Sequence, residues 1–312
     1  MQVNGLIFRE LVRRGYSIAG ETRVWNIADS KLWYLTPELS KGFLNLFEYE
    51  PYRKVVVDTE VGLLKKYALQ IVQKLGSKRF NLIDLGCGGG KKTAEFVKNL
   101  PSDVKLLYSP VDISEYFIDK AIKSVKEVDS EKVVEIKSSV SDFRDFDNLF
   151  DKIKSNEYKD NVLLLLGETL SHYDINDLLR TLSEPLLEGD ILIIGNGYRV
   201  GERFVDIDKY KAPLFNEWFV NVVKGLGFAD GEVEYDVRFA NERLEAYYKI
   251  LADKRVLHEG TKVDFKKGDE IVVATQSKFF LDELEKFCGM YFSNVELLTD
   301  EEKEYCLVIC KK

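Results

Sequence analysis

Residues 81–93 read Asn-Leu-Ile-Asp-Leu-Gly-Cys-Gly-Gly-Gly-Lys-Lys-Thr, and this stretch decides the fold. Its first half is a short apolar run that predicts a buried strand, and its end predicts the start of a helix. The glycines between them predict a tight turn, because a residue without a Cβ lets the backbone turn sharply and approach a ligand closely. A strand, a glycine turn and a helix in this order predict one βα unit of an open sheet.

The same alternation of strands and helices continues along residues 61–197. The run at 161–167 is the most continuously apolar one, which is typical of a strand buried on both faces at the centre of a parallel sheet. Right-handed βαβ units of this kind predict a doubly wound α/β core. We expect helices at 61–75, 91–100, 115–128, 143–153 and 175–187, and strands at 81–86, 105–113, 133–140, 161–167 and 190–195.

The alternation stops after residue 197. Residues 198–277 are richer in aromatic and charged side chains and are interpreted as an insertion, with a helix at 214–226 and strands at 233–239 and 243–251. Residues 278–312 complete the core with a helix at 279–288 and strands at 295–298 and 305–310, joined by a polar turn at 300–303. These two strands predict a terminal antiparallel hairpin. Residues 1–60 form an N-terminal segment that precedes the sheet.

Composition narrows the classes of partner. The chain has 312 residues, of which 45 are Lys or Arg and 53 are Asp or Glu, so its formal charge is −8. A nucleic-acid partner usually requires a basic surface, and no basic block is present, so a small-molecule or protein substrate is favoured over a nucleic acid. No segment has the length and apolarity of a membrane span, so we expect a cytoplasmic protein without a membrane partner. The oligomeric state is left open.

Cysteine and histidine usage does not support a metal site. The four cysteines form no Cys-x-x-Cys pair, and His172 and His258 are the only histidines. Cys306 and Cys310 are expected on one face of a strand, where burial is favoured over a disulfide.

The loop and an acid beyond it together indicate the ligand. Dinucleotide-binding loops follow Gly-x-Gly-x-x-Gly, but here Lys91 takes the third glycine position, which with Asp84 favours S-adenosylmethionine. Asp112 follows the next strand about two dozen residues later, the spacing at which a carboxylate accepts hydrogen bonds from a ribose diol. Asp112 could instead cap the helix that begins near Ser114.

The third strand is followed by Ser141-Asp-Phe143. Asp142 is expected near the exocyclic amine of adenine and Phe143 near its ring, although Asp142 could equally be the N-cap of the next helix. The predicted cofactor-binding set is Asp84, Gly86, Gly88, Lys91, Asp112, Ile113, Asp142, Phe143 and Gly167.

A more specific resemblance rests on Leu85-Gly-Cys-Gly-Gly-Gly-Lys-Lys-Thr93 and Pro110-Val-Asp-Ile-Ser114. Together these motifs resemble the histidine-specific methyltransferase family, whose named members trimethylate the α-amine of L-histidine in ergothioneine biosynthesis. The resemblance implies a Rossmann-like class I methyltransferase sheet that binds S-adenosylmethionine. It also implies that the N-terminal segment, with its aromatic Tyr34, Phe43 and Tyr52, joins residues 198–277 in one lid-like substrate domain.

The resemblance extends to the substrate-binding residues, with departures. Leu214-Phe-Asn216 and Glu245-Ala-Tyr-Tyr248 resemble the family's insertion, and Gly268-Asp-Glu-Ile271 leading to Ser277 resembles its late substrate-binding strand. The family carries a substrate-binding Asn after the fourth strand, where Gly167-Glu-Thr-Leu-Ser-His-Tyr173 places His172 instead. It also carries a Glu where Thr275 stands. The candidate substrate-binding residues are Tyr52, His172, Asn216, Thr275 and Ser277.

These features predict an S-adenosylmethionine-dependent methyltransferase that N-methylates a small amine or amino acid other than unmodified histidine. His172 is the candidate catalytic residue, orienting the substrate or taking a proton, although a histidine after a buried strand could also be structural. The alternatives are a protein or RNA methyltransferase and a non-catalytic module that binds the cofactor. The absence of an Asn-Pro-Pro-Tyr-like motif disfavours methylation of base amino groups, and the intact glycines with Asp112 disfavour the non-catalytic module.

Overall fold

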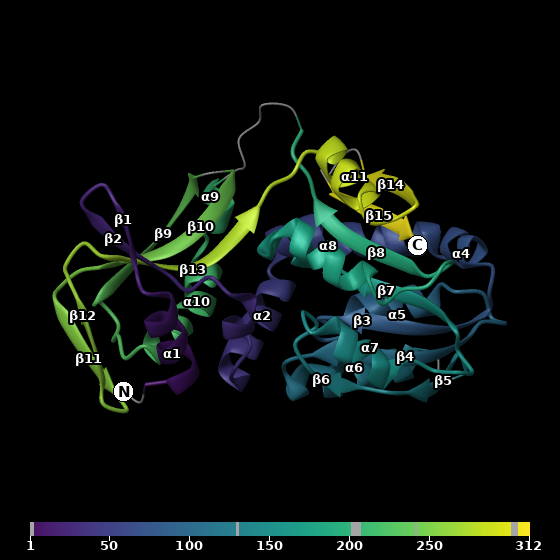
Figure 1. The fold of residues 1–312 in the computed structure, drawn as a ribbon, viewed down its shortest axis with the longest axis horizontal. Helices are drawn as coiled ribbons and strands as arrows, with labels where there is room; N and C mark the ends of the chain where they lie inside the picture. Colours follow the sequence, from purple (N-terminus) through teal and green to yellow (C-terminus); the bar gives the residue numbers. More distant parts are fainter. Residues whose placement is uncertain (1–2, 129–130, 201–206, 241, 301–304) are drawn as a thin grey trace. The chain divides into compact units, whose positions relative to one another are not determined.

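The computed structural model describes residues 3–128, 131–200, 207–240, 242–300 and 305–312. The chain divides into two compact units (Figure 1). The first unit contains the described residues of Met1–Leu46 and Arg203–Lys278, and the second unit contains those of Phe47–Glu202 and Phe279–Lys312. Each unit is built around its own sheet.

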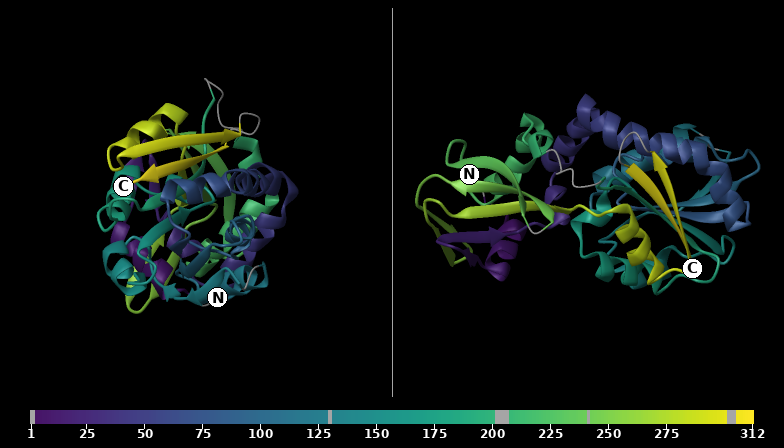
Figure 2. Two further views of the ribbon diagram at one scale, coloured as in Figure 1. Left: turned by 90° about the vertical axis from the view of Figure 1, so that its right-hand side faces the viewer. Right: turned by 90° about the horizontal axis from the view of Figure 1, so that it is seen from above.

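The second unit holds an eight-stranded, mostly parallel sheet, so the predicted class I methyltransferase architecture is confirmed. The order is β14-β15-β8-β7-β3-β4-β5, and β6 also pairs with β4. The C-terminal hairpin is antiparallel and forms one edge of the sheet, as the yellow strands of Figure 2 show. The strands are β3 (Arg79–Leu85), β4 (Lys105–Asp112), β5 (Val133–Ile136), β6 (Ser139–Val140), β7 (Asp160–Leu165), β8 (Ile191–Gly197), β14 (Asn294–Asp300) and β15 (Tyr305–Lys311).

Helices cover both faces of this sheet, because both faces of its central strands are apolar. One apolar layer contains side chains from α4 (Asp58–Leu75), α5 (Lys91–Lys98) and α6 (Glu115–Val128). The other contains side chains from α7 (Phe146–Ile153), α8 (Ile175–Ser183) and α11 (Leu281–Gly289). Cys306 and Cys310 are buried in this second layer as free thiols, as expected.

The chain approaches α4 through helical turns that we did not predict. These are α3 (Glu50–Tyr52) and a π-helical turn, η2 (Arg53–Val57), so the helical run starts well before the predicted residue 61. Val56 packs into the same apolar layer as α4, and the Thr59 hydroxyl donates to the Lys54 carbonyl at 3.0 Å. Residues 47–60 therefore belong to the second unit, whereas the predicted boundary lies at residue 60.

The first unit contains a five-stranded sheet of order β1-β2-β13-β10-β9 and a separate β11–β12 hairpin. Strand β2 pairs in parallel with β13, so the N-terminal segment and the insertion share one sheet, in keeping with the family resemblance. The strands are β1 (Ser17–Ala19), β2 (Thr22–Asn26), β9 (Val233–Ala240), β10 (Arg243–Ile250), β11 (Lys254–His258), β12 (Thr261–Phe265) and β13 (Glu270–Ser277). The helices are α1 (Gly5–Arg14), η1 (Ser30–Trp33), α9 (Ile207–Tyr210), α10 (Pro213–Gly225) and α2 (Pro37–Glu48), whose last two residues are counted with the second unit.

Among the helices that the structure describes, none combines the length and the apolar character needed to cross a membrane.

Candidate functional site

The glycine turn joins β3 to α5 and is tied to the neighbouring strand. The N–H groups of Gly86 and Cys87 donate to the Val111 carbonyl, at 2.8 and 3.1 Å. Gly90, at the N-terminal end of α5, has φ of 72°, and a Cβ there would lie 2.5 Å from the Cα of Ala121 on α6. Glycine is required at this position both by the left-handed backbone and by the close approach of α6.

Asp112 meets this turn from the end of β4. Its Oδ2 accepts the Gly88 N–H at 3.1 Å, and its Oδ1 accepts the Ser114 N–H at 3.0 Å. Burial raises the pKa of Asp112 to about 6, although these backbone hydrogen bonds act to lower it. Asp112 thus contacts the glycine turn directly, and Ile113 follows it just after the strand; their predicted contacts with the cofactor stay predictions. Helix α6 begins at Glu115, and the Ser114 carbonyl accepts its first helical hydrogen bonds, so Ser114 is at the N-cap position and Asp112 is not the cap of this helix.

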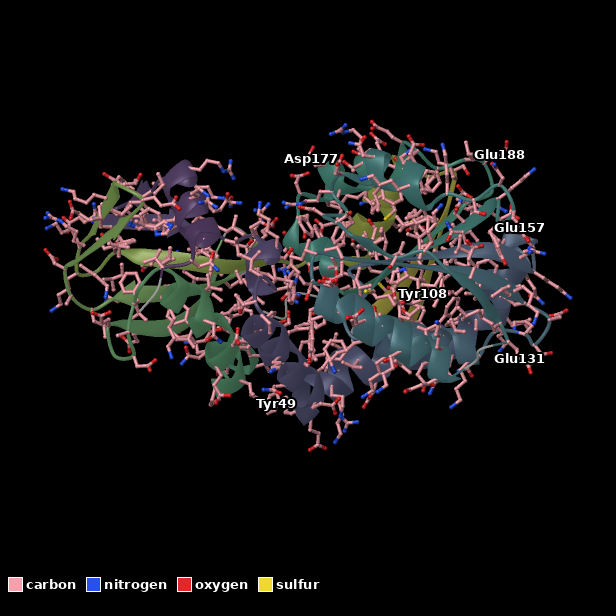
Figure 3. The ribbon with its side chains drawn as sticks, turned by 90° about the horizontal axis from the view of Figure 1, so that it is seen from below. Tyr49, Tyr108, Glu131, Glu157, Asp177 and Glu188 are labelled. Atoms are coloured by element: carbon pink, nitrogen blue, oxygen red, sulfur yellow. The ribbon has the colours of Figure 1, made fainter. Side chains whose placement is uncertain are left out.

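Asp84 ties three elements together beneath the turn. Its Oδ2 accepts hydrogen bonds from the Thr93 hydroxyl on α5 at 2.6 Å and from the Tyr108 hydroxyl on β4 at 2.9 Å. Figure 3 shows Tyr108 inside the second unit. Burial raises the pKa of Asp84 to about 6. This carboxylate therefore fixes the first turn of α5 against the sheet, and we assign it a positioning role within the predicted cofactor-binding set.

Ser141-Asp-Phe143 is anchored to the same strand end, because the Ser141 N–H donates to the Asp112 carbonyl at 2.9 Å. The Phe143 ring is adjacent to the turn, with one ring carbon 3.6 Å from where a Cβ on Gly86 would lie. Asp142 accepts hydrogen bonds from the Arg144 N–H at 3.0 Å and from Arg144 Nε at 2.9 Å. Helix α7 begins only at Phe146, so Asp142 is not its N-cap.

Two adjacent lysines on α5 occupy different environments. Lys91, the predicted cofactor residue, is exposed, and its ammonium lies 3.4 Å from Glu48 Oε1. Lys92 is only 7 % exposed and pairs with Glu60, which is fully buried. Sequence reasoning missed Lys92 and Glu60. The signal for Lys92 was available, since it precedes the apolar Phe96 by four residues and so shares its face of the helix.

The Lys92 ammonium is buried against Glu60 and lies close to Gly167. Its positive charge fits the amino-acid end of S-adenosylmethionine, which carries a carboxylate. Within the described ranges, Lys92 Nζ has no hydrogen-bond partner beyond its ion pair with Glu60, while the Phe47 ring centroid lies 5.2 Å away. An ammonium has three N–H groups, and Glu60 is the one ion-pair partner of Lys92 among the described residues, so a ligand carboxylate would accept a further, charge-assisted hydrogen bond.

The end of β7 leads to the candidate catalytic residue. Gly167 and Glu168 both have left-handed backbones, with φ of 76° and 61°, and the Glu168 N–H donates to the Gly195 carbonyl at 3.0 Å. A positive φ is uncommon for a residue with a side chain and is concentrated at functional sites. The turn leads into η3 (Thr169–His172), so the partly buried His172 follows directly from this strained turn. Tyr52, partly buried on α3, lies 6.2 Å from Phe47 between ring centroids.

The predicted substrate residues of the first unit do not gather on one face. On β13, Thr275 lies opposite Glu245 of β10, and Ser277 lies opposite Arg243. Asn216 on α10 instead accepts a hydrogen bond at 2.8 Å from the hydroxyl of Tyr248. Because successive side chains of a strand alternate, Tyr248 and Glu245 lie on opposite faces of β10. Thr275 and Ser277 therefore share a face that Asn216 does not.

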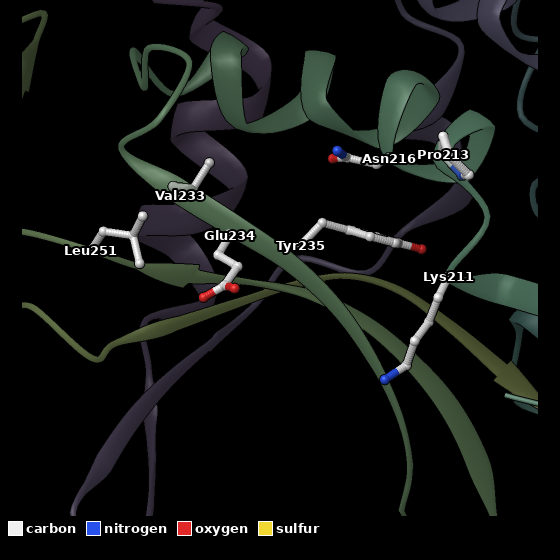
Figure 4. Close-up of a pocket in the computed structure, with 7 residues that line it drawn as sticks. All are labelled: Lys211, Pro213, Asn216, Val233, Glu234, Tyr235 and Leu251. Atoms are coloured by element: carbon white, nitrogen blue, oxygen red, sulfur yellow. The ribbon is translucent and has the colours of Figure 1, made fainter. Parts of the chain in front are cut away.

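Asn216 instead contributes to a cavity of about 600 Å³ beside the edge strand β9. Figure 4 shows it with residues of α10 and β9 and with the Lys211 side chain. The full lining is Lys211, Pro213, Asn216, Val233, Glu234, Tyr235 and Leu251.

Thr275 and Ser277 belong to a group that we call the polar face of the first unit. At its centre, Arg238 donates to Glu245 at 2.7 Å and to Glu270 at 2.5 Å. Thr275 stands where the family carries Glu, and the carboxylate of Glu245 lies opposite it on the neighbouring strand. That carboxylate is already paired with Arg238. The polar face comprises Asp236, Arg238, Glu245, Tyr247, Glu270, Thr275 and Ser277.

A class I sheet with a glycine turn bonded to Asp112 defines an S-adenosylmethionine-dependent methyltransferase. The chain belongs to the histidine-specific, S-adenosylmethionine-dependent methyltransferase family, whose model matches residues 40–312. No curated protein matches the chain.

Several solved structures are similar to the chain at low identity. An S-adenosylmethionine-dependent methyltransferase from Clostridium acetobutylicum is 14% identical, with a TM-score of 0.46 over 87% of this chain and 98% of that one. DesVI from Streptomyces venezuelae is 15% identical, with a TM-score of 0.41 over 81% and 91%. CalS10 from Micromonospora echinaspora, an amino pentose methyltransferase solved with S-adenosylmethionine bound, is 13% identical, with a TM-score of 0.43 over 84% and 95%.

Proposed function

We propose that this methyltransferase N-methylates a small amine or amino acid other than unmodified histidine. The observation that carries the proposal is Thr275, which stands where the family has Glu. The neighbouring carboxylate of Glu245 does not replace that Glu, since it is paired with Arg238. A buried site rejects ligands that leave its polar groups or their own unpaired, often by orders of magnitude.

The cofactor-side residues have separate roles in this proposal. Asp112 accepts hydrogen bonds from the ribose hydroxyls, and Lys92 pairs with the carboxylate of the amino-acid end. Asp84 keeps α5 in place through Thr93, and Phe143 lies beside the adenine. S-adenosylmethionine supplies a methyl group made electrophilic by the attached sulfonium. The chain's own contribution is to bind, align and exclude water, and alignment alone is worth roughly 7–11 kcal/mol in favourable cases.

The acceptor amine must be uncharged when it reacts. A nearby positive charge lowers the pKa of an amine, so a dedicated base is not obligatory. His172, the last residue of η3, orients the acceptor or takes its proton in this proposal. Tyr52, Asn216, Thr275 and Ser277 remain candidate acceptor contacts, and the separate location of Asn216 favours Thr275 and Ser277 as the specificity pair.

Product analysis by mass spectrometry tests this function. The protein is incubated with S-adenosylmethionine and a panel of free amino acids and amines, with L-histidine as the reference acceptor. We expect methylation of a panel member at least about tenfold faster than of L-histidine. Efficient trimethylation of L-histidine contradicts the proposal.

A parallel incubation with labelled cofactor and a protein- and RNA-containing extract separates the alternatives. Label in macromolecules alone supports a protein or RNA methyltransferase. Cofactor binding without any transfer supports a non-catalytic module. The formal charge of −8 argues against a nucleic-acid acceptor.

We further propose that the protein acts in the cytoplasm. All four cysteines are buried and free, which suits a reducing compartment. Localisation of the tagged protein by cell fractionation tests this assignment.

A further inference from the structure

Glu60 lies in the first turn of α4, is completely buried, and is reached by groups from three other elements. Its Oε1 accepts the Gly167 N–H at 2.9 Å, at the end of β7, and the Tyr305 hydroxyl at 2.8 Å, from β15. Its Oε2 pairs with the Lys92 ammonium of α5. One carboxylate thus connects the helix after the glycine turn with the turn that leads to His172.

Two glycines leave room for this carboxylate and its partner. A Cβ on Gly195, in β8, would lie 1.6 Å from Glu60 Oε1, a distance that no real structure allows. A Cβ on Gly167 would lie 3.1 Å from Lys92 Nζ. The backbone within β8 and in the turn after β7 is therefore compatible with the Glu60–Lys92 pair only because these two positions lack side chains.

Stability alone does not explain the pair. Removing two charges from water is costly, and apolar residues of similar volume are often as stabilising in such places. Burial also raises the pKa of Tyr305 well above its usual range, so its hydroxyl remains a donor to Glu60. Lys92 Nζ and Glu60 Oε2 form an ion pair with each other, and in the part of the chain that the structure describes neither atom has another hydrogen-bond partner.

We propose that Glu60 is a positioning residue that holds Lys92 toward the carboxylate of the bound cofactor. Through the Gly167 N–H, the same carboxylate also fixes the turn that precedes His172. Glu60 therefore acts on the amino-acid end of the cofactor and leaves its adenosine end unaffected. This inference rests on the proposed role of Lys92 in cofactor binding.

Glu60→Gln isolates this role, because the amide keeps an oxygen for Gly167 and Tyr305 but presents an NH2 group in place of one carboxylate oxygen. Calorimetry compares S-adenosylmethionine with 5′-methylthioadenosine, which lacks the amino-acid end. We expect Glu60→Gln to weaken S-adenosylmethionine binding about 10- to 100-fold while 5′-methylthioadenosine changes less than about twofold. Lys92→Met should give the same selective loss, and Glu60→Gln added to Lys92→Met should cause no further selective loss.

Glu48→Gln is the matched control, because Glu48 pairs with the adjacent Lys91 at the surface and should leave both affinities unchanged. Equal weakening of both ligands by Glu60→Gln, or no weakening of either, overturns the inference. So does a further selective loss of about tenfold in the double variant. If wild-type protein binds neither ligand, cofactor binding itself fails instead.

Should Glu60→Gln not fold alone, Glu60→Gln combined with Lys92→Met removes both charges, while the amide oxygen still accepts hydrogen bonds from the Gly167 N–H and the Tyr305 hydroxyl. That variant should fold and should bind 5′-methylthioadenosine normally while binding S-adenosylmethionine weakly. Normal binding of both ligands by this double variant overturns the inference.

Discussion

The cofactor-side residues of the second unit and the polar face of the first unit hold their carboxylates differently. Asp84, Asp112 and Glu60 are buried, and their partners are backbone N–H groups, hydroxyls and one buried lysine. Glu245 and Glu270 of the polar face are partly buried and share Arg238. Buried carboxylates cannot be exchanged singly without leaving a donor unpaired, whereas partly exposed ion pairs contribute little and can be exchanged. We therefore expect substitutions among the buried carboxylates to affect cofactor binding and folding, and substitutions on the polar face to affect the choice of acceptor.

The largest expected effect comes from Asp112→Ala. Losing two charge-assisted hydrogen bonds to the ribose should weaken S-adenosylmethionine binding about 100-fold or more. Calorimetry measures this, with Asp119→Ala as the control, because Asp119 is exposed on α6. Tight binding of NAD with no binding of S-adenosylmethionine would show that the cofactor assignment is wrong.

Glycine substitutions compare how closely the backbone is packed in the two units. Gly90→Ala adds a Cβ 2.5 Å from Ala121 in a left-handed conformation, so the free energy of unfolding should fall by about 2–4 kcal/mol. Gly231→Ala in the first unit has φ of 81° but open space around it, so its loss should be about 1 kcal/mol. Thermal unfolding measures both. Equal losses would contradict the role of the α6 contact.

The buried carboxylates of the second unit and those of the polar face should also respond differently to pH. Because the folded pKa values of Asp84 and Asp112 are raised to about 6, the folded state binds protons more tightly than the unfolded chain. These two groups therefore favour folding more at pH 5 than at pH 7. Cofactor binding should change in the opposite direction, since protonated Asp112 loses its charge-assisted hydrogen bonds.

Affinity for S-adenosylmethionine should fall about tenfold between pH 7 and pH 5. The Lys211 ammonium lowers the pKa of Asp236, so this carboxylate of the polar face should stay charged over that range. Asp112→Asn is the control and should flatten the profile of affinity against pH. An unchanged pH dependence in that variant would assign the titration to another group.

Acceptor choice should respond to one residue of the polar face. Thr275→Glu restores the side chain that the family carries and should raise kcat/KM for L-histidine about tenfold relative to the preferred acceptor. Mass spectrometry of mixed-acceptor reactions measures the ratio, with Thr261→Glu on the separate hairpin as the control. An unchanged ratio would remove Thr275 from the specificity pair.

The smallest effect is expected for Lys91→Met. The side chain is exposed and its ion pair with Glu48 is at the surface, so affinity for S-adenosylmethionine should change less than about twofold. A loss of affinity as large as that caused by Lys92→Met would instead show that Lys91 contacts the cofactor, as the sequence predicts.

The core was predictable because its elements are periodic. The apolar run at β7 and the glycine turn after β3 can each be recognised from a few consecutive residues, and Asp112 follows the turn at a recognisable spacing. Glu60 carries no such signal, since its partners lie 32, 107 and 245 positions away in Lys92, Gly167 and Tyr305. The short strands β1, in which all three residues are exposed, and β11, in which one residue is buried, show too few apolar repeats to be predicted.

Opposite faces of a sheet likewise cannot be assigned before the register is known. Asn216 and Thr275 were grouped by resemblance alone. Their separation follows from the pairing of β10 with β13 and from the Tyr248 hydrogen bond to α10.

The parallel pairing of β2 with β13 means that, during synthesis, β2 is exposed for some time before its partner strand is made. Val24 of β2 pairs with Glu270, so one strand is made long before its partner exists. At common rates of translation, the interval is about 10–50 s. Through that interval the growing chain carries an unmatched strand edge. A chaperone-poor expression system should therefore lose more of this protein to aggregation than of one whose neighbouring strands are consecutive in sequence.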